Sequence, residues 1–550
     1  MVAAVAIVAV RLPARELAAG AVERLQARWA DISGTTDPVV PVGDAVAIVS
    51  SGDAGSPISP LIYGVAFADS GVVSRLGATV DRWGGNTSTG YNWVTHSWNA
   101  GRDWEFRNKP ADDADTFVQA ALAGGATPLL TVPTIGYVAR DGDNGTRSVG
   151  VPSTGGPPLA PGSSRIAGYD PTANQLATSI PSYPRKAAPF VVDPVPNPSA
   201  VYQDEWVNHL TVRFGSGASG VRLFAMDNEP DIWSSTHTDV HPVRMSYADM
   251  LKNFEDYATA VKAVEPDAVI LGPEVCCWTS LYYSDLDRGT DNFRSHADRN
   301  AHGGQAFLPW WLTQVARADA ANHARSLDLL DVHFYPQADG VFSDRSDPAT
   351  QALRIRSVRS LWDPSYSDES WISTGVDLIP RLRAWIASAY PGTGIAISEY
   401  NFGGEHDASG AVAQAEALGV FGREGLRLAA YWTHPAVDSP VGAVFRLYRN
   451  FDGNGDRFGD RSLPASSDGP NIRVFAARHS DSNEIDTVAV NESLTTATRV
   501  KVGYATAGWR STAAYCIQPG TASVAMAPLD ASGGLEMQPL AVCVVKAVRP

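Results

Sequence analysis

Residues 221–230 read VRLFAMDNEP, and residues 394–401 read GIAISEYN. In each stretch a short apolar run is followed by polar residues that include one glutamate, Glu229 in the first and Glu399 in the second. Short apolar runs of this kind are typical of buried β-strands. We therefore expect each glutamate to stand at the carboxyl end of a buried strand.

The same pattern recurs along the chain between residues 58 and 435. Eight apolar runs predict strands, at Leu61–Phe67, Val80–Trp83, Thr127–Val132, Val221–Met226, Ala268–Leu271, Leu327–His333, Gly394–Ser398 and Leu428–Trp432. Amphipathic stretches that predict helices lie between several of them, at Ala111–Leu122, Tyr247–Val264, Phe307–Ala321 and Ile379–Ala389. Strand and helix alternating eight times predict a (β/α)8 barrel, the TIM barrel. Polar residues at the carboxyl ends of its strands would meet on the face where barrel enzymes carry out their chemistry.

The connection between the third and fourth runs, residues 133–198, is unusually long. It is rich in Pro, Gly and Ser and shows no clear periodicity. Loops of this length are either functional or disordered. We expect this one to wall a cleft at the barrel face, and a disordered insertion is the alternative.

A different pattern begins after about residue 440. Short alternating runs are separated by turn residues, for example at Ile472–Ala476, Thr487–Val490, Arg499–Tyr504 and Ala541–Val545. This pattern predicts a second, smaller antiparallel β-sandwich domain at residues 441–550, after a barrel at residues 58–440. The stretch Ala45–Val49 is also strand-like, so we expect the N-terminal segment, residues 1–57, to add a strand to the sandwich.

The composition restricts the classes of molecule that the protein could bind. The chain has 550 residues, a formal net charge of −16 and a pI of about 5.1. An acidic chain is poorly suited to nucleic acid or to an anionic membrane, which attract basic patches. A neutral polymer is compatible with this charge, and 15 Trp and 18 Tyr offer flat rings on which sugars could stack, although many of them will be core. We expect a monomer.

The four cysteines and the N-terminus give little information about the cellular location of the protein. Cys276 and Cys277 are adjacent, and because neighbouring residues rarely bridge, we expect two free buried thiols. Cys516 and Cys543 could form a disulfide, but their pairing stays open. Met1–Val10 is apolar, is too short to span a membrane and lacks the basic start of a signal peptide.

The two glutamates form the pair of carboxyl groups that hydrolysis of a glycosidic bond requires. One carboxyl protonates the leaving oxygen, and in a retaining enzyme the other attacks the anomeric carbon. We assign Glu229 as acid/base, because Asn228 before it could bond the 2-hydroxyl of the sugar, and Glu399 as nucleophile. Their predicted strands, the fourth and the seventh, would face each other across the barrel opening. A surface ion pair is the alternative for either glutamate alone.

Further polar and aromatic side chains are expected to line the cleft. Arg82 and Asn86 could bond hydroxyls or the nucleophile, or could only hold their loop. Tyr335 could donate to the nucleophile, His333 is a cleft residue or a satisfied core histidine, and Glu274 is a third carboxylate or an ion-pair partner. The candidates for stacking on sugars, each with a core position as its alternative, are Trp93, Trp233, Trp278 and Trp432.

Metal binding is the weakest feature of the sequence. In the loop of residues 452–460, oxygen donors occupy positions 1, 3, 5 and 9 of a calcium-type loop, namely Asp452, Asn454, Asp456 and Asp460. Position 12 is Leu463 where an EF-hand has Glu, so at most a structural calcium is expected. A second acidic cluster comprises Asp103, Asp112, Asp113 and Asp115. Neither step of the glycosidase chemistry requires a metal or another cofactor.

Five segments together resemble the motifs of glycoside hydrolase family 44. They are residues 58–64 (ISPLIYG), 81–93 (DRWGGNTSTGYNW), 227–233 (DNEPDIW), 331–337 (DVHFYPQ) and 398–404 (SEYNFGG). The resemblance runs from about Ala45 to the C-terminus; residues 1–40 have no counterpart, and the Pro/Ser-rich loop of residues 133–198 is a departure.

The resemblance implies a barrel with a β-sandwich, a retaining mechanism, and cleavage within β-1,4-glucans, including carboxymethylcellulose-type substrates and xyloglucan. It also makes a structural calcium somewhere in the barrel an expectation. A related retaining enzyme on xylan or mannan, and a polysaccharide-binding protein without turnover, are the alternatives. The size of such polymers implies secretion.

Overall fold

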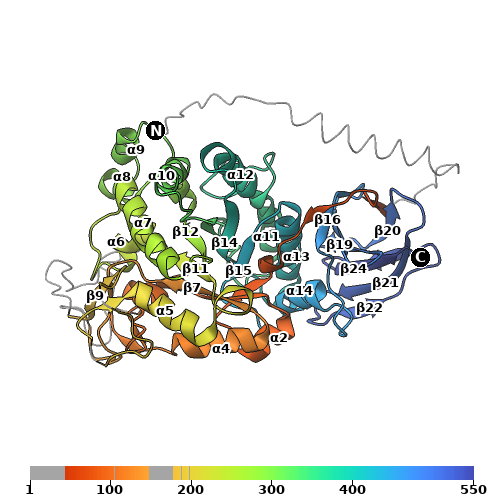
Figure 1. The fold of residues 1–550 in the computed structure, drawn as a ribbon. Helices are drawn as coiled ribbons and strands as arrows, with labels where there is room; N and C mark the ends of the chain where they lie inside the picture. The colour runs from red at the N-terminus through yellow and green to blue at the C-terminus, as the bar shows by residue number, and fades with distance from the viewer. Residues whose placement is uncertain (1–43, 105, 148–176, 188, 197, 550) are drawn as a thin grey trace.

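The computed structural model describes residues 44–104, 106–147, 177–187, 189–196 and 198–549. Eight parallel strands close into a barrel, which Figure 1 shows ringed by helices. In chain order they are β3 (Gly64–Ala66), β4 (Val80–Trp83), β7 (Thr127–Val132), β11 (Leu223–Met226), β12 (Val269–Val275), β13 (Leu329–Phe334), β14 (Gly394–Tyr400) and β15 (Leu428–Tyr431). All eight predicted strands are present, and the prediction of a TIM barrel is confirmed.

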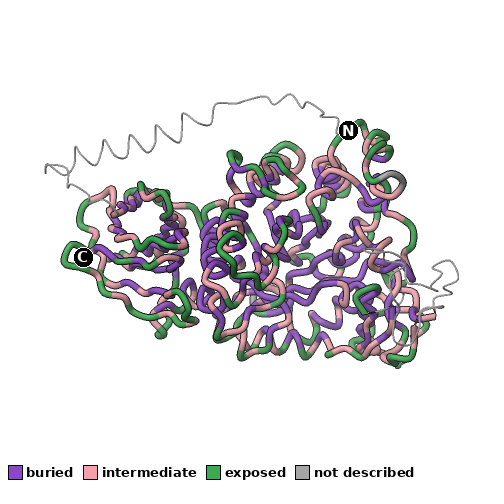
Figure 2. The backbone as a smooth tube through the Cα atoms, turned by 180° about the vertical axis from the view of Figure 1, so that it is seen from behind, coloured by how far each residue is buried: buried purple, intermediate pink, exposed green. Residues whose placement is uncertain are grey.

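The barrel interior is filled by apolar side chains rather than left open. One layer of buried residues comes from seven of the eight strands: Val80, Leu129, Leu223, Ala225, Leu271, Leu329, Ala396 and Leu428. In Figure 2 the barrel strands are almost continuously buried. A filled barrel is a rigid frame, so side chains at its rim are held in fixed positions.

Helices cover the outside of the barrel. The main ones are α2 (Ser70–Leu76), α4 (Ala114–Gly124), α5 (Gln203–Phe214), α7 (Tyr247–Val264), α10 (Phe307–Asn322), α11 (Pro348–Ser357), α12 (Leu378–Ala389), α13 (Ala408–Arg423) and α14 (Pro440–Arg449). None of the described helices is long and apolar enough to cross a membrane.

Helix α7 illustrates why these segments are helical. Ser246 and Asp249 form a capping box at its start, which satisfies backbone N–H groups that have no partner within the helix. Met250, Phe254 and Val261 recur at helical spacing and are buried. The ring of Phe254 lies 4.8 Å from that of Trp311 on α10, so the apolar face of α7 packs against its neighbour as well as the barrel.

One domain boundary and the content of one long connection differ from the prediction. Residue 440 was expected to end the barrel, but α14 starts there, follows β15 and packs beside α13 and α2, so the barrel extends to Arg449. The connection of residues 133–198 contains described strands, β8 (Tyr137–Ala139) and β9 (Ser179–Tyr183), which form a three-stranded sheet with β10 (Val201–Tyr202). The remainder of that connection, residues 148–176, lies outside the described residues.

The second domain consists of two packed sheets. Among the described residues, one sheet has the order β2-β16-β18-β19-β24-β21-β22 and the other β17-β1-β20-β23. Strand β1 (Asp44–Val49) lies between β17 (Ala465–Ser467) and β20 (Thr498–Tyr504), so residues near the start of the chain belong to this C-terminal domain. Residues 1–43 lie outside the described part.

The bounds of the other strands in these sheets follow. They are β2 (Ser56–Pro57), β16 (Arg461–Leu463), β18 (Ile472–Arg478), β19 (Glu484–Asn491), β21 (Arg510–Ile517), β22 (Ala525–Ala527), β23 (Gly534–Met537) and β24 (Val542–Val548). All pairings except that of β1 with β20 are antiparallel.

All four cysteines are in disulfides. Cys516 and Cys543 join the neighbouring strands β21 and β24. Cys276 and Cys277 are bonded to each other, so the prediction of two free thiols is wrong. The reason is local: the chain leaves β12 at Val275, and beyond that point the alternation that sends neighbouring side chains to opposite faces no longer holds.

Candidate active site

Glu229 and Glu399 meet at the carboxyl ends of the barrel strands. Glu229 follows β11 by three residues, and Glu399 is the last residue but one of β14. The imidazole of His333, from β13, lies between them, with Nδ1 2.9 Å from Oε1 of Glu229 and 3.4 Å from Oε2 of Glu399. A carboxylate oxygen of Glu229 lies within 4.8 Å of one of Glu399. The fourth and seventh strands therefore bring the two glutamates together.

Arg82, at the end of β4, holds the carboxylate of Glu399. Its guanidinium is buried and donates from Nη1 to Oε1 of Glu399 at 2.6 Å. From Nη2 it donates to Oε1 of Glu274 at 2.6 Å and to Oδ1 of Asn228 at 3.0 Å. Glu274 is thus a third buried carboxylate of the site and also the ion-pair partner of Arg82.

Each oxygen of Glu399 has its own donor. Arg82 occupies Oε1, and the hydroxyl of Tyr335, just beyond β13, donates to Oε2 at 2.9 Å. A carboxylate held by two charged or polar donors keeps one orientation. Tyr335 therefore lies where the sequence analysis placed it, against the expected nucleophile.

The environments of the two glutamates move their pKa values in opposite directions. Burial raises the pKa of Glu229 above its ordinary value, and the hydrogen bond from His333 only partly offsets it. Burial also opposes ionisation of Glu399, but the charges of His333 and Arg82 outweigh it and lower the pKa of Glu399. Burial disfavours the charged form of His333, yet the neighbouring carboxylates raise its pKa well above its ordinary value. The pKa values of the two carboxyl groups are thus moved apart, the arrangement that an acid and a nucleophile require.

The backbone around the site is in an unusual conformation. Asp227, Glu229 and Glu274 have φ values of 68°, 46° and 57°, the left-handed region that side chains other than glycine rarely adopt. Each costs on the order of 1–3 kcal/mol, and such residues cluster at functional sites. The N–H of Glu229 donates to the carbonyl of Glu274 at 3.2 Å, which links the two strand ends.

The carboxylate of Asp227 stabilises this conformation, and the sequence analysis did not single it out. It accepts from the hydroxyl of Thr89 at 2.6 Å and from the N–H groups of Asn228 and Ile135 at 2.7 and 3.0 Å, and also from the N–H of Thr134. Burial raises the pKa of Asp227 to about 6. Its signal in the sequence is only its position at the end of an apolar run.

Asn228 and Asn86 lie beside Arg82. The amide of Asn228 accepts from Arg82 and donates to Oδ1 of Asn86 at 3.3 Å, and Asn86 in turn donates to Asp103 at 2.7 Å. Asn86 is half-buried. Trp432, just beyond β15, is also half-buried, with the guanidinium of Arg82 5.6 Å from its ring. These residues form the side of the site next to strands β4 and β15.

The four tryptophans singled out from the sequence separate into two groups. Trp93 and Trp233 are 3% and 1% exposed, so neither offers a ring face to a sugar, and both belong to the core. Trp93 packs against His209 of α5, and Trp233 lies beneath the Glu229 segment, donating to the carbonyl of Asn228. Trp278 and Trp432 are half-buried and remain candidates for contact with sugar.

Two exposed aromatic side chains near the site were missed. Phe342 is 52% exposed and packs against the ring of Tyr335, with centroids 5.2 Å apart. Trp371 is 61% exposed and donates from Nε1 to Gln337 at 3.4 Å. Both lie in irregular connections after β13, where no periodicity or motif marks a residue as functional.

The structural calcium expected in the loop of residues 452–460 stays a prediction, but the carboxylates of Asp452, Asp456 and Asp460 do not converge among the described residues. Asp452 caps its own loop by accepting from the N–H groups of Asn454 and Asp456. Asp456 pairs with Lys546 at 2.7 Å, and Asp460 accepts from the N–H and hydroxyl of Ser480. The second acidic cluster is dispersed as well: Asp113 caps α4, Asp115 pairs with His209, and Asp103 binds Asn86.

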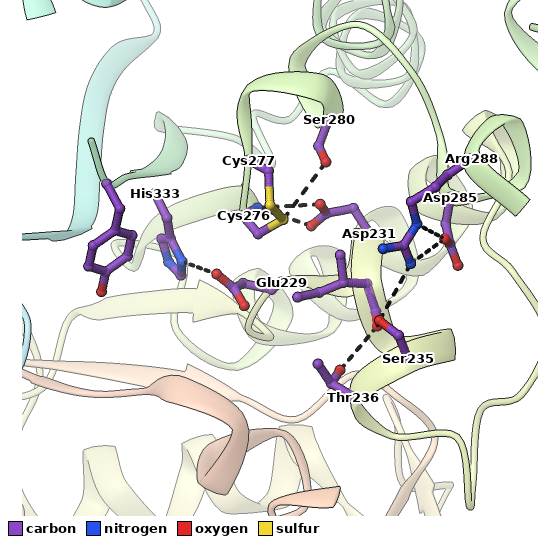
Figure 3. The surroundings of a disulfide bond; sticks show 12 residues. Glu229, Asp231, Ser235, Thr236, Cys276, Cys277, Ser280, Asp285, Arg288 and His333 are labelled. Atoms are coloured by element: carbon purple, nitrogen blue, oxygen red, sulfur yellow. Dashed lines mark hydrogen bonds and ion pairs between the residues drawn. A yellow bond between two sulfur atoms is a disulfide. The ribbon is translucent and has the colours of Figure 1, made fainter. Parts of the chain in front are cut away.

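Within the described residues, ligand-type side chains converge in two places. One comprises Asp231, Cys276 and Cys277, and the other Glu229, His333 and Glu399. The first sulfurs are bonded to each other, and the second group is held by its own hydrogen bonds. The two groups are neighbours: Figure 3 shows Glu229 and His333 of the second beside the disulfide of the first.

The chain is similar to known glycoside hydrolases. The family model of glycoside hydrolase family 44 matches residues 97–338. Endoglucanase A of Paenibacillus lautus is 33% identical over 469 residues, which are 79% of this chain and 62% of that protein. Beta-mannanase/endoglucanase A of Caldicellulosiruptor saccharolyticus is 31% identical over 488 residues, 81% of this chain and 34% of that protein. The chain therefore spans less than two thirds of the length of these curated relatives.

Solved structures are similar over nearly the whole chain. CelM2, a bifunctional glucanase-xylanase from a metagenome library, is 32% identical with a TM-score of 0.81, covering 92% of this chain and 99% of that one. A Paenibacillus polymyxa xyloglucanase of glycoside hydrolase family 44, solved with xyloglucan, is 27% identical with a TM-score of 0.80, covering 92% of this chain and 100% of that one.

Proposed function

The chain belongs to glycoside hydrolase family 44, and from this premise we propose that it cleaves β-1,4-glucans, including xyloglucan, within the polymer and with retention of configuration. Glu229 acts as acid/base and Glu399 as nucleophile. The observation that carries the proposal is the pair itself: two carboxyl groups on facing strands, close together and with pKa values moved apart.

The separation of the pair supports retention. Retaining enzymes hold their two carboxyl groups about 5–5.5 Å apart, whereas inverting enzymes need about 6.5–9.5 Å to admit a water between carboxylate and sugar. Oxygens of Glu229 and Glu399 lie within 4.8 Å of each other, which leaves no room for that water. Direct attack by Glu399 on the anomeric carbon is the reaction that fits this spacing.

In the first step, ionised Glu399 forms a bond to the anomeric carbon while the glycosidic C–O bond breaks. Glu229 gives its proton to the departing oxygen, and a glycosyl-enzyme ester results. Negative charge moves from Glu399 to Glu229 in this step. The imidazole of His333, 2.9 Å from Glu229 and 3.4 Å from Glu399, faces the charge before and after the transfer.

In the second step, water releases the sugar from Glu399. Glu229, now ionised, takes a proton from the water as the oxygen attacks the anomeric carbon, and Glu399 leaves as a carboxylate. Arg82 and Tyr335 donate to the two oxygens of Glu399, so they stabilise the carboxylate as it re-forms. The protein returns to its starting protonation state, and no metal or cofactor takes part in either step.

The choice of glucan rests on the relatives. The P. lautus and P. polymyxa proteins are named for glucan and xyloglucan, but the other two names include mannanase and xylanase. Xylan and mannan are therefore the second candidates, with the same mechanism. We also propose that the protein acts outside the cell, because the polymers are too large to enter. We further propose that it acts as a monomer.

Reducing-end release from xyloglucan, carboxymethylcellulose, mannan and xylan tests the proposal. We expect release from the two glucans by the parent and a loss of about 10⁴-fold or more in Glu399→Gln. Glu536→Gln, an exposed glutamate of β23 in the sandwich, is the matched control and should keep the parental rate. Release from mannan or xylan alone would replace the substrate, and a folded Glu399→Gln with near-parental activity would remove Glu399 as nucleophile.

A further inference from the structure

We propose that the Cys276–Cys277 disulfide is a substrate-contacting surface, which receives the sugar ring of the leaving group beside Glu229. The proposal rests on the proposed function and deepens it by assigning a binding surface for the departing end of the glucan. The disulfide is not buried as a structural crosslink would be: Cys276 is 8% exposed, but Cys277 is exposed to solvent.

The disulfide lines a pocket that opens into the active site. Trp278 and the apolar side chains of Leu281, Ile372, Val376 and Leu378 line the same pocket. His333 and Tyr335, which bond Glu229 and Glu399, are part of its wall. The pocket is small, about 20 Å³, which is room for a water or two, so a sugar would lie across its mouth, on the exposed Cys277 and beside the residues that bond the two glutamates.

The position of the disulfide on the barrel indicates which sugar it contacts. The glycosidic bond must lie between Glu229 on the fourth strand and Glu399 on the seventh. A glucan bound there has sugars on both sides of the line that joins these residues. On one side lie the ends of the second and eighth strands, β4 and β15, with Arg82 and Trp432. On the other side lie the ends of the fifth and sixth strands, which supply the disulfide pocket.

The position of Asn228 indicates which side holds the attacked sugar and which side holds the departing sugar. It precedes the acid/base, and its amide bonds Arg82 and Asn86 on the side of the second strand. If Asn228 bonds the 2-hydroxyl of the attacked sugar, that sugar lies on the side of Arg82. The sugar that departs with the proton of Glu229 then lies over the fifth and sixth strands, against the disulfide.

The chemistry of a disulfide suits the face of a sugar ring. The C–H groups of a pyranose form an apolar patch, and sulfur is polarisable and donates no hydrogen bond once it is in a disulfide. Two bonded neighbouring side chains cannot rotate independently, so they lose little conformational entropy when a ligand binds. Gln337, exposed at the same pocket, offers an amide to ring hydroxyls.

The disulfide is also anchored to the catalytic segment. The N–H of Cys276 donates to the buried carboxylate of Asp231 at 3.1 Å, and Asp231 follows Glu229 by two residues. Figure 3 shows the disulfide between Asp231 on one side and the Glu229–His333 pair on the other. This hydrogen bond fixes the position of the disulfide relative to Glu229. A fixed position suits a sugar that is joined to the oxygen that Glu229 protonates.

The test measures how the glycosyl-enzyme divides between water and a sugar acceptor. A residue that binds the departing sugar also binds an incoming one, because the second step reverses the path of the first. With 2,4-dinitrophenyl β-cellobioside as donor and cellobiose as acceptor, the ratio of transfer product to hydrolysis product reports binding of the acceptor on the leaving-group side of Glu229. We expect the ratio to fall about tenfold in Cys276→Ala/Cys277→Ala, as for the loss of one apolar contact. An unchanged ratio overturns the proposal.

Reduction of the parent protein provides a second measurement that does not depend on a variant folding. Tris(2-carboxyethyl)phosphine attacks one sulfur and breaks the S–S bond, and water then supplies the oxygen of the phosphine oxide and the protons of the two thiols. Cys277 is exposed, whereas Cys516 and Cys543 are 1% and 0% exposed, so the first disulfide should react first. We expect the ratio to fall on reduction and to recover on reoxidation with oxidised glutathione. No fall after complete reduction of this bond overturns the proposal.

The alanine variant is also the control for the reagent. Its ratio should show no further fall with the phosphine; an equal fall in parent and variant would assign the effect to Cys516–Cys543 and overturn the proposal. Failure of the proposed function looks different. A parent that hydrolyses no β-glucan fails as a glucanase. A parent that hydrolyses β-glucan but forms no transfer product at any acceptor concentration binds no sugar at this surface and overturns the disulfide proposal alone.

Discussion

The guanidinium of Arg82 lies 2.6 Å from Oε1 of Glu399, and both groups are shielded from solvent. The same guanidinium binds Glu274 and Asn228, so one side chain from the second strand joins the ends of the fourth, fifth and seventh. Its three contacts use the planar fork of arginine, which lysine lacks. Arg82 is therefore the counterion of the nucleophile, and it also links strand ends across the barrel opening.

Arg82→Met should change both stability and the pH profile. Removing one partner leaves Glu274 and Glu399 buried without their cation, which costs about 3–5 kcal/mol of unfolding free energy. Because Arg82 lowers the pKa of Glu399, its loss raises that pKa and moves the acidic limb of kcat/KM to higher pH. Urea unfolding and a pH–rate profile measure the two effects. Arg510→Met, at an exposed position of β21, is the control and should alter neither.

The pH–rate profile of the parent should be bell-shaped. Glu399 must be ionised to attack, and its lowered pKa places the acidic limb below the ordinary glutamate value of 4.5. Glu229 must be protonated to act as acid, and its raised pKa places the basic limb above 4.5. Activity therefore falls toward acid as Glu399 gains a proton and toward alkali as Glu229 loses one. A profile with a single limb would show that one of these assignments is incorrect.

Glu229→Ala should lose the acid but keep the nucleophile. Hydrolysis of unactivated glucans should fall by about 10²–10⁴-fold, because the leaving oxygen is no longer protonated. A dinitrophenyl glycoside needs no proton to depart, so its first step should survive and the glycosyl-enzyme should accumulate. Added azide, a small anion, should then release a β-glycosyl azide and restore turnover, which product analysis by NMR can follow. An α-glycosyl azide would contradict retention.

The barrel could be predicted from the sequence because its strands are local and apolar. Buried parallel strands need short runs of apolar residues, and each of the eight is visible in isolation. The pair of glutamates was predictable for the same reason, since β11 and β14 end just before or at them. The end of the barrel was less visible, because α14 is an amphipathic helix that lies against strand-rich sequence.

Side-chain exposure could not be predicted. Trp93 and Trp432 both follow barrel strands, yet His209, distant in sequence, covers Trp93 and leaves it buried, whereas Trp432 stays open above Arg82. The bond between Cys276 and Cys277 depends on the turn after β12, and the general rarity of such bonds argued against it. These features depend on tertiary contacts that no local pattern records.

Trp371 and Phe342 offer a test of the extended cleft beyond the catalytic pair. Both rings are more than half exposed and lie next to residues of the site, Gln337 and Tyr335 respectively. A ring covered by a sugar loses apolar surface to the ligand, which stabilises binding by about 25 cal/mol for each Å² removed from water. Trp371→Ala should therefore raise KM for xyloglucan roughly three- to tenfold, with a smaller effect on kcat, because Trp371 touches no residue that contacts Glu399.

Phe342→Ala should behave differently from Trp371→Ala. The ring of Phe342 packs against Tyr335, whose hydroxyl donates to Glu399 at 2.9 Å, so its loss frees the tyrosine and should lower kcat as well as raise KM. Met526→Ala, a 72% exposed apolar residue of β22 in the sandwich, is the control for removing exposed apolar surface and should change neither constant. Equal KM values in the parent and both aromatic variants would confine the bound polymer to the sugars next to the cleaved bond, and would exclude the surface beyond β13 from the cleft.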